Sequence, residues 1–348
     1  MLKKSPLAPV LALVLLLTAA FISSPAQSQG TTRIAFGSCN SQDEPQPLWP
    51  SINATQPDLW VWLGDNIYAD THSMDTLASK YNRQLQQPGY QELLKHTPVT
   101  GTWDDHDFGY NDAGGEFAWK AQSQQLFLDF MGVPKDAPVR KQEGIYRSYT
   151  IGEGEQKVKV LLLDERYHRD SFNKMFGLYL PNWKGKVLHE AQWQWLEQEL
   201  TNSDASVHLI VSGMQVLPTG HAYTNLSAYP NTRKRLLALL EKTKPAIPII
   251  LSGDRHVGEL GKISLEGYKY PLYEITSSGM THHRKASSKG NPYRIGEQVG
   301  TLNFGVLDIS WGKDNTAITM QIRGKGNKVL LEKQVIYEKK EQAVSAMQ

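Results

Sequence analysis

The sequence predicts an α/β fold in which two mixed β-sheets pack face to face and helices flank them. In the first half of the chain, strand-like apolar runs alternate with segments of helical periodicity. The second half is rich in strand-like runs and has few helical segments. A β-rich half that follows an α/β half favours two sheets packed against each other.

The chain opens with a segment typical of a secretory signal peptide. Lys3 and Lys4 precede the apolar residues 7–22, and small residues surround Ala26 and Ser28. This order predicts a signal peptide over residues 1–28, cleaved after Ala26 or Ser28. A retained anchor is the alternative, although the apolar run is short for a bilayer span of about 20 residues. We therefore expect an exported protein, periplasmic or extracellular, with no membrane span after cleavage.

Length and composition limit the kinds of molecule that the protein is expected to bind. The 348 residues carry a formal net charge of +2, and loss of Lys3 and Lys4 with the leader brings it to zero. Such a balance gives no support to nucleic acid or a membrane surface as an electrostatic partner. No low-complexity linker or internal repeat interrupts the chain, so we expect one large domain over residues 31–340. A single cysteine, Cys39, excludes an intramolecular disulfide.

The first two predicted strands end in side chains that suit metal binding. Residues 33–40 close on Gly-Ser-Cys39-Asn40, and the apolar run 58–64 is followed directly by Asp65, with Tyr68 three residues later. A buried strand that ends on Gly-Asp delivers a carboxylate to the edge of the sheet where α/β proteins place their sites. A free thiol in an oxidising compartment is a liability unless it is buried or bound to a metal. A thiolate and a phenolate around one ion favour a ferric ion.

An acidic segment follows two predicted helices. Residues 76–96 have a roughly helical pattern that Pro88-Gly89 divides into two pieces. Residues 104–112 then hold four Asp, one His and one Asn, interleaved with aromatic side chains that favour partial burial. Acidic loops are often only solvated turns. Because buried, unpaired carboxylates are costly, a metal or phosphate site explains this segment better.

The middle of the chain supplies candidate phosphate contacts. Residues 116–131 predict an amphipathic helix, and residues 144–151 and 157–163 predict strands. The second strand leads into a loop that contains Arg166 and Arg169. Arginine suits bidentate contact with phosphate, while surface salt bridging is the alternative reading, more so for Arg169.

The second half repeats the Gly-Asp pattern of the first. Helices are predicted over residues 187–202 and 232–242, and strands over 206–214 and 247–252. The latter strand ends in Ser-Gly-Asp254-Arg-His256, so we expect Asp254 and His256 to join Asp65 as metal ligands at one sheet edge. Further strands are predicted over 272–278, 302–311, 317–323 and 329–337, and the polar turn 276–284 offers His282 as a late ligand.

With these pieces in order, the chain resembles the PhoD-like (alkaline phosphatase D) branch of the metallophosphoesterases. The resemblance covers almost the whole mature chain, and the pairing of a cysteine with Gly-Asp-x-x-Tyr is its most specific part. The matching motifs are Gly-Ser-Cys39-Asn, Leu-Gly-Asp65-Asn-Ile-Tyr68, Trp-Asp104-Asp105-His106-Asp-Phe with Asn111-Asp112, Leu-Asp164-Glu-Arg166-Tyr and Ser-Gly-Asp254-Arg-His256.

The resemblance implies a four-layer metallophosphatase-like sandwich and a cluster of iron (Fe³⁺) with calcium. It implies that Cys39 and Tyr68 bind iron, that Asp65 bridges metals, and that Asp254 and His256 are late ligands. Asn111 matches the family's asparagine ligand, although the segment between His106 and Asn111 is slightly longer here. Further candidate ligands are Asn40, Asp105, Asp112 and His282.

The expected activity is hydrolysis of phosphate monoesters or diesters, small or polymeric, by a metal-bound oxygen nucleophile, with His106 and Arg166 contacting phosphate. Two alternatives remain at this point. One is a phosphodiesterase or phospholipase specific for lipid or polymer headgroups, with Trp- and Tyr-rich loops holding a bulky group. The other is a non-enzymatic, calcium-stabilised binding module whose acidic loops hold structural ions only.

Overall fold

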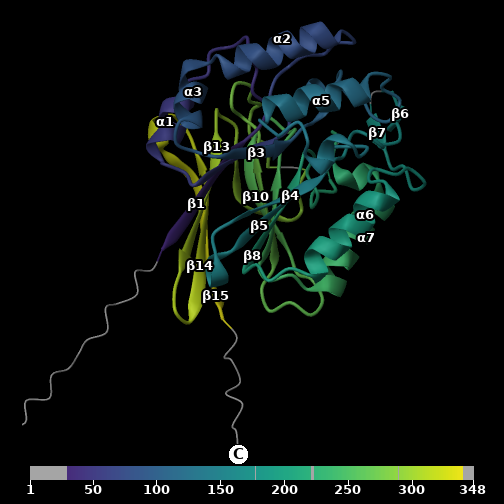
Figure 1. The fold of residues 1–348 in the computed structure, drawn as a ribbon. Coiled ribbons are helices and arrows are strands. Elements are labelled where there is room, and N and C mark those ends of the chain that lie inside the picture. Colours follow the sequence, from purple (N-terminus) through teal and green to yellow (C-terminus); the bar gives the residue numbers. More distant parts are fainter. Residues whose placement is uncertain (1–29, 177, 221–222, 289, 340–348) are drawn as a thin grey trace, which may run out of the picture.

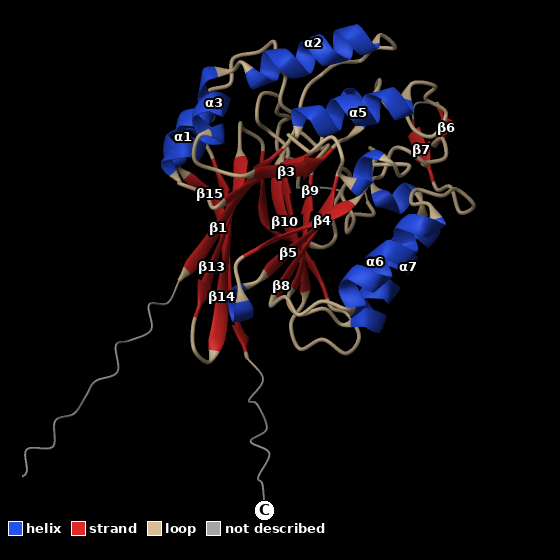
Figure 2. Ribbon diagram, in the orientation of Figure 1, coloured by secondary structure: helices blue, strands red, loops and turns tan. Residues whose placement is uncertain are grey.

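The structure is a computed structural model that describes residues 30–339 except 177, 221–222 and 289. The predicted signal peptide over residues 1–28 lies outside the described residues. Figures 1 and 2 show two β-sheets in the centre of the molecule and helices on their outer sides. This arrangement confirms the predicted class of two packed mixed sheets flanked by helices.

The first sheet joins the two ends of the described chain. It is built from Thr31–Gly37 (β1), Leu59–Leu63 (β2), Val99–Thr102 (β3), Phe304–Trp311 (β13), Asn315–Arg323 (β14) and Val329–Glu338 (β15). Its six strands lie in the order β15-β14-β13-β1-β2-β3. β1, β2 and β3 run parallel, whereas β13 pairs antiparallel with both β1 and β14.

The second sheet carries the middle of the chain. It is built from Arg147–Ile151 (β4), Val158–Leu162 (β5), Val207–Ser212 (β8), Pro248–Ser252 (β9), Gly258–Ile263 (β10), Leu272–Ser277 (β11) and Arg294–Val299 (β12). The order is β12-β10-β11-β9-β8-β5-β4, and its central strands β5, β8, β9 and β11 are parallel. A separate hairpin consists of Asn173–Met175 (β6) and Leu178–Leu180 (β7).

Helices cover the outer face of each sheet. They are Trp49–Ala54 (α1), Met74–Leu85 (α2), Pro88–Leu94 (α3), Asp105–Phe108 (α4), Lys120–Phe130 (α5), Glu190–Thr201 (α6) and Pro230–Thr243 (α7). Short 3₁₀ turns occupy Pro138–Arg140, Gly154–Gln156, Leu226–Ala228 and Lys325–Asn327. None of the helices in the described part of the chain has the length and apolar character of a bilayer span.

The period-2 alternation of strand side chains separates three hydrophobic cores. In β2, Val61 belongs to the core between the sheets, whereas Trp60 and Trp62 point to the opposite face. In the second sheet, Ile210 and Ile250 face α6 and α7. Successive side chains on a strand point to opposite faces, so the layers are helices, sheet, sheet and helices. This is the predicted four-layer sandwich.

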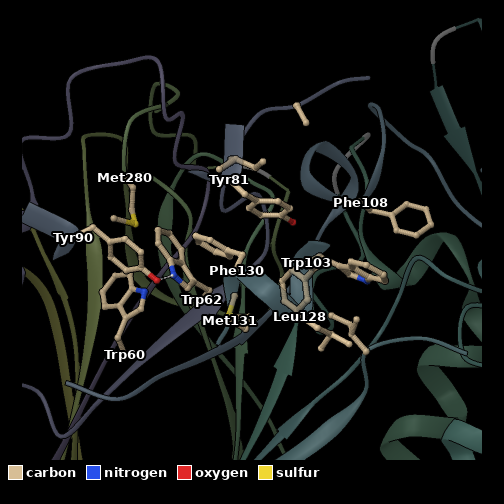
Figure 3. Packing of buried hydrophobic residues seen from close by; sticks show 14 of the residues in the cluster. Trp60, Trp62, Tyr81, Tyr90, Trp103, Phe108, Leu128, Phe130, Met131 and Met280 are labelled. Atoms are coloured by element: carbon tan, nitrogen blue, oxygen red, sulfur yellow. Dashed lines mark hydrogen bonds between the residues drawn. The ribbon is translucent and has the colours of Figure 1, made fainter. Parts of the chain in front are cut away.

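An aromatic cluster fills the layer between the first sheet and its helices (Figure 3). The Trp49 ring lies 5.3 Å from that of Trp60 and 5.7 Å from that of Trp62, measured between centroids. The Trp62 indole N–H donates to the Tyr90 hydroxyl over 3.1 Å, so its buried polar atom is satisfied. The cluster fixes α1 and α3 against β2, the strand that leads directly to Asp65.

The expected helices and all of the expected strands are present, with shifts at their ends. The helix predicted from residue 116 begins at Lys120, and the pattern over 76–96 resolves into α2 and α3, where Pro88 begins the second helix. The strands β3, β6 and β7 were not predicted, nor were β10 and β12. The sequences of β10 and β12, GELGKI and RIGEQV, contain glycine and charged residues that are disfavoured in isolated strands, and pairing with β11 and with each other decides their conformation.

The two sheets come into close contact at Gly253, just beyond β9. A Cβ at this position would lie 2.5 Å from the Leu63 carbonyl oxygen and 2.8 Å from Ser38 Oγ. We expect Gly253→Ala to lower the free energy of unfolding by about 1–3 kcal/mol, because overpacking must push the sheets apart. The measurement is urea denaturation. Gly261→Ala is the control, because its nearest new contact would be 3.6 Å away; equal effects of the two substitutions would contradict the prediction.

Candidate metal centre

The segments that the sequence marked as reactive converge at the carboxyl edges of the two sheets. Cys39 follows β1, Asp65 follows β2, and Asp105 begins α4 directly after β3. Asp254 and His256 follow β9 of the second sheet. Both sheets therefore contribute to one cluster, which explains why its members are distant in sequence.

The first group of potential ligands contains the only thiol of the chain. Ligand atoms of Cys39, Asp65 and His256 all lie within 4.8 Å of one another. The Cys39 Sγ is 3.6 Å from Asp65 Oδ2, and the Tyr68 hydroxyl is 3.0 Å from His256 Nε2. A thiol, a carboxylate, an imidazole and a phenol thus face a common point.

A second group shares Asp65 with the first. It consists of Asp65, Asp105 and His106, again with ligand atoms within 4.8 Å of one another. The His106 backbone N–H donates to Asp65 Oδ1 over 3.3 Å, while its ring Nδ1 lies 2.8 Å from Asp70 Oδ1. A carboxylate on one ring nitrogen fixes the orientation of an imidazole and leaves the other nitrogen for a ligand.

The third group joins the two sheets. Asp104, Asp105 and Asp254 have ligand atoms within 4.8 Å of one another. Asp254 accepts from the Thr224 hydroxyl at 2.9 Å and 2.8 Å through its two oxygens. Because Asp105 belongs to the second and third groups and Asp65 to the first and second, the three groups form one chain of carboxylates.

Arg166, which was expected to contact phosphate, is buried beside the third group. Its side chain has no exposed surface, and its Nε donates to Asp104 Oδ1 over 2.6 Å. Its Nη2 also lies 3.7 Å from Asp105 Oδ1. The positive charge of this buried guanidinium stabilises the buried carboxylates of Asp104 and Asp105. Arg169 is likewise buried, with its guanidinium bound to the Tyr229 hydroxyl and to backbone carbonyls of Asp112 and Asp170.

The backbone at the cluster is unusual. Cys39, Asp65, Asp254 and His256 have φ values of 58°, 48°, 69° and 58°, in the left-handed region that non-glycine residues rarely adopt. Each such residue costs free energy that the surrounding structure must supply, and such residues gather at functional sites. The conformation turns each side chain sharply out of the end of its strand and toward the centre.

Burial disfavours the charged forms of the acidic groups at the centre, so that a nearby positive charge would stabilise them. Burial raises the pKa of Asp65 well above its usual range, and the neighbouring Asp105 and Asp107 charges raise it further against the effect of His106. Burial likewise raises the pKa of Cys39, with the charges of Asp65 and Asp254 adding to it, while hydrogen bonding to Ser38 and Tyr68 opposes it. A bound cation reverses this balance, because it stabilises the anionic forms.

The two imidazoles of the centre are shifted in opposite directions. Burial lowers the pKa of His106, but the charge of Asp65 and the hydrogen bond that the ring donates to Asp70 outweigh it and bring the pKa to about 10. Burial and the positive charge of Arg284 lower the pKa of His256 to about 3. His256 is therefore neutral near pH 7, which is the form that binds metals.

The donor set fits resident metal ions. Among the described residues, four buried carboxylate or amide oxygens at the centre have no hydrogen-bond partner: Asn40 Oδ1, Asn66 Oδ1, Asp104 Oδ2 and Asp105 Oδ1. Buried acceptors without a donor are costly in a folded protein, and coordination to a cation satisfies them. Sulfur, nitrogen and oxygen donors lie at one end of the cluster, and oxygen donors dominate the other.

The other candidate ligands from the sequence lie around this centre and differ in how far they are buried. The Tyr68 ring is held between the rings of His106 and His282, with centroids 4.4 Å and 4.6 Å away. Asp112 donates its backbone N–H to Asp105, whereas its carboxylate binds Lys174 and Tyr179 of the β6–β7 hairpin. Asn111 is exposed, and its backbone N–H donates to Asp70.

Three residues that support the centre were missed in the sequence. Asp107 accepts from the backbone N–H groups of Asp65, Asn66 and Asp104, so it fixes the turn after β2. Its position three residues after Asp104 is capping-box spacing, a signal that was available. Asp70 lies close to Tyr68 in sequence, but only the fold brings it to His106, and nothing in the sequence marks Thr224.

A family model described as "PhoD-like phosphatase" matches residues 34–294. A solved structure of PhoD aligns with a TM-score of 0.72 at 16% sequence identity, covering 89% of this chain and 70% of that one. A crystal structure of a dimetal phosphatase from Danio rerio aligns with a TM-score of 0.54 at 13% identity, covering 88% of this chain and 99% of that one. At these identities the structural likeness shows the fold alone. A search of curated proteins finds no match.

Proposed function

Because the chain belongs to the PhoD-like phosphatase family and is a metal-dependent phosphoester hydrolase, we propose that it acts on phosphate monoesters, diesters or both, with iron and calcium bound at the centre described above. The observation that carries this proposal is the convergence of Cys39, Asp65, Tyr68 and His256. Family membership also decides against the reading as a non-enzymatic binding module.

We assign the ligands from their chemistry and their distances. Cys39, Tyr68 and His256 form the softer end, which suits ferric iron. Asp105 and Asp254 form the oxygen-rich end, which suits calcium. Asn40, next to Cys39 in the chain, is a further candidate ligand. Asp65 lies between the two ends and is the candidate bridge. Asp112 and Asn111 remain candidates whose side chains would have to turn inward.

When bound, such ions lower the pKa of water, bind phosphate oxygens and stabilise the charge of the transition state. The chain itself supplies orientation and a proton donor. Asp70 holds the His106 ring, whose side chain is 19% exposed, so His106 is placed to donate a hydrogen bond to a phosphate oxygen. Arg166 acts one step further away, because it positions Asp104 and Asp105.

A second candidate function is hydrolysis of diesters that carry a bulky apolar group. The β6–β7 hairpin contacts the centre through Asp112, and its residue Phe176 is 95% exposed, with Trp183 nearby in sequence 63% exposed. Large exposed aromatic side chains beside a site favour an apolar ligand group. The ratio of rates on bis(4-nitrophenyl) phosphate and 4-nitrophenyl phosphate separates a diesterase from a monoesterase, and this candidate function predicts a higher rate on the diester.

Export rests on the sequence of residues 1–28. We propose that the signal peptide is removed and that the mature enzyme works outside the cytoplasm. Mass spectrometry of the protein isolated from its native host measures the N-terminus. An intact residue 1 in that protein would contradict the proposal.

We expect the protein to hold iron and calcium and to show a visible charge-transfer band. Treatment with a chelator should remove the band and lower kcat/KM on 4-nitrophenyl phosphate by at least about 10³-fold, because the ions supply several kcal/mol of transition-state stabilisation. Both should return when iron and calcium are added together. Tyr68→Phe should bleach the band, whereas the control Tyr110→Phe should not, because the Tyr110 ring packs against His72 and Phe117. Colourless, fully active protein would contradict the iron assignment.

A further inference from the structure

A basic cavity of about 290 Å³ lies beside the metal centre, on the side of the second sheet. Its wall contains the charged side chains of Arg255, Arg284, Lys285 and Arg294, and among the described residues that line it Glu259 is the one acidic side chain. Tyr223 contributes an aromatic ring. None of these residues belongs to the ligand groups of the centre.

The turn after β9 connects the cavity to the centre. The backbone of Asp254 and of His256 has positive φ, in the left-handed region. Between them, the Arg255 backbone N–H donates to the Gly253 carbonyl over 2.9 Å. In this turn Asp254 and His256 face the metal centre, while Arg255 faces the cavity. The Arg284 backbone N–H donates to the His256 carbonyl over 2.8 Å, so the second arginine is attached to the same turn.

The segment before the 3₁₀ turn at residue 226 makes a second connection. The Thr224 hydroxyl donates to Asp254, and the adjacent Tyr223 lies beneath two guanidinium groups. The Arg255 Cζ is 4.3 Å and the Arg284 Cζ 4.8 Å from the centre of the Tyr223 ring. An aromatic face stabilises a cation without neutralising its charge.

The acidic side chain in the wall does not neutralise the two arginines on Tyr223. Glu259 Oε2 accepts from Arg294 Nε at 2.7 Å, and Glu259 Oε1 accepts from Gln215 at 2.6 Å and from Asn291 at 3.0 Å. Within the part of the chain that the structure describes, the guanidinium groups of Arg255 and Arg284 make no ion pair with a carboxylate. Two like charges held together in this way favour an anionic ligand.

We propose that this cavity, called here the second-anion pocket (Tyr223, Arg255, Arg284 and Lys285), binds a second anionic group of the substrate. The substrates are then phosphoesters that carry a further phosphate or carboxylate beyond the ester that is hydrolysed. The inference rests on the proposed function, because the pocket is useful only while the reacting phosphate occupies the adjacent centre. Planar, bidentate guanidinium groups suit a tetrahedral or planar oxyanion.

The test uses non-hydrolysable probes, so that binding and turnover are measured separately. Alkane-α,ω-bisphosphonates of increasing chain length are titrated into the metal-loaded protein by calorimetry, each against the alkylphosphonate of the same length. For at least one length we expect the bisphosphonate to bind about tenfold more tightly, which corresponds to one charge-assisted contact. Arg284→Met should remove this advantage, which is measured as the ratio of the two Kd values within the variant itself.

Arg235→Met is the matched control, because Arg235 also lies over an aromatic ring, Trp193 at 4.6 Å, but on α7 at the far side of the second sheet. It should keep the full bisphosphonate advantage. The proposal is overturned if no bisphosphonate binds more tightly than its partner, or if the advantage survives Arg284→Met. Failure of the proposed function gives a different result, namely no turnover of aryl phosphates whatever the binding ratio.

Discussion

Asp65→Asn is expected to lower kcat/KM by about 10³-fold or more and to reduce the metal content of the purified protein. Asp65 belongs to two of the three ligand groups, with Oδ2 facing the Cys39 Sγ and Oδ1 accepting from the His106 backbone N–H. Asparagine preserves the shape of the side chain but removes its charge. It therefore separates the electrostatic role of the carboxylate from its packing.

The same substitution has an informative effect on stability. Because burial raises the pKa of Asp65 well above its usual range, ionisation of this group opposes folding in metal-free protein near pH 7. Metal-free Asp65→Asn should therefore be at least as stable as metal-free wild type in urea denaturation. Asp75→Asn, in the first turn of α2, is the control and should change neither activity nor metal content. Full metal content and activity in Asp65→Asn would refute the bridging role.

Arg166→Met is expected to lower the free energy of unfolding by about 3–5 kcal/mol, because it leaves the Asp104 carboxylate buried without its cation. Both side chains are fully buried, and Arg166 Nε donates to Asp104 over 2.6 Å. The double variant Asp104→Asn/Arg166→Met should recover part of this loss, because no unpaired charge remains. Denaturation of the four proteins gives the coupling energy.

A partly exposed ion pair provides the comparison. Arg33 pairs with Asp308 at 2.6 Å, but the two side chains are 34% and 18% exposed. Arg33→Met should therefore cost no more than about 1 kcal/mol, because solvent screens the pair. If Arg166→Met lowers the free energy of unfolding by no more than Arg33→Met does, Arg166 is not needed to stabilise the Asp104 carboxylate. Its supporting role at the centre would then be wrong.

Local sequence patterns predicted most of the fold. Apolar runs such as Leu59–Leu63 and Pro248–Ser252 are fully buried strands, and their Gly-Asp endings lie at the edge where the centre forms. Such strands can be predicted from the sequence because a strand buried on both faces requires a continuous apolar run. Strands β10 and β12 could not be predicted in this way, because pairing with neighbouring strands stabilises them and their own sequences do not.

The sequence marked residues that converge in the fold, but it did not indicate their geometry, and metal binding by them stays a prediction. Cys39, Asp65, Tyr68, Asp254 and His256 were all marked by residue type and by their place after a strand, and the fold brings them together. The sequence could not indicate that Arg166 faces Asp104 and not the solvent. A loop arginine has the same local pattern whether it binds phosphate or a buried carboxylate, and only its burial distinguishes the two.

The amino-acid sequence by itself determined the family, the order of most strands along the chain and the residue types available for binding metals, because these depend on short motifs and on short-range periodicity. The tertiary structure alone decided which oxygen, nitrogen and sulfur atoms share a space, which carboxylates receive a cation from the protein, and which arginines remain available beside the centre. Those outcomes depend on contacts between segments separated by up to about two hundred residues along the chain, such as the one between Tyr68 and His256. Contacts of that range are set by how two sheets pack, and no local pattern encodes them.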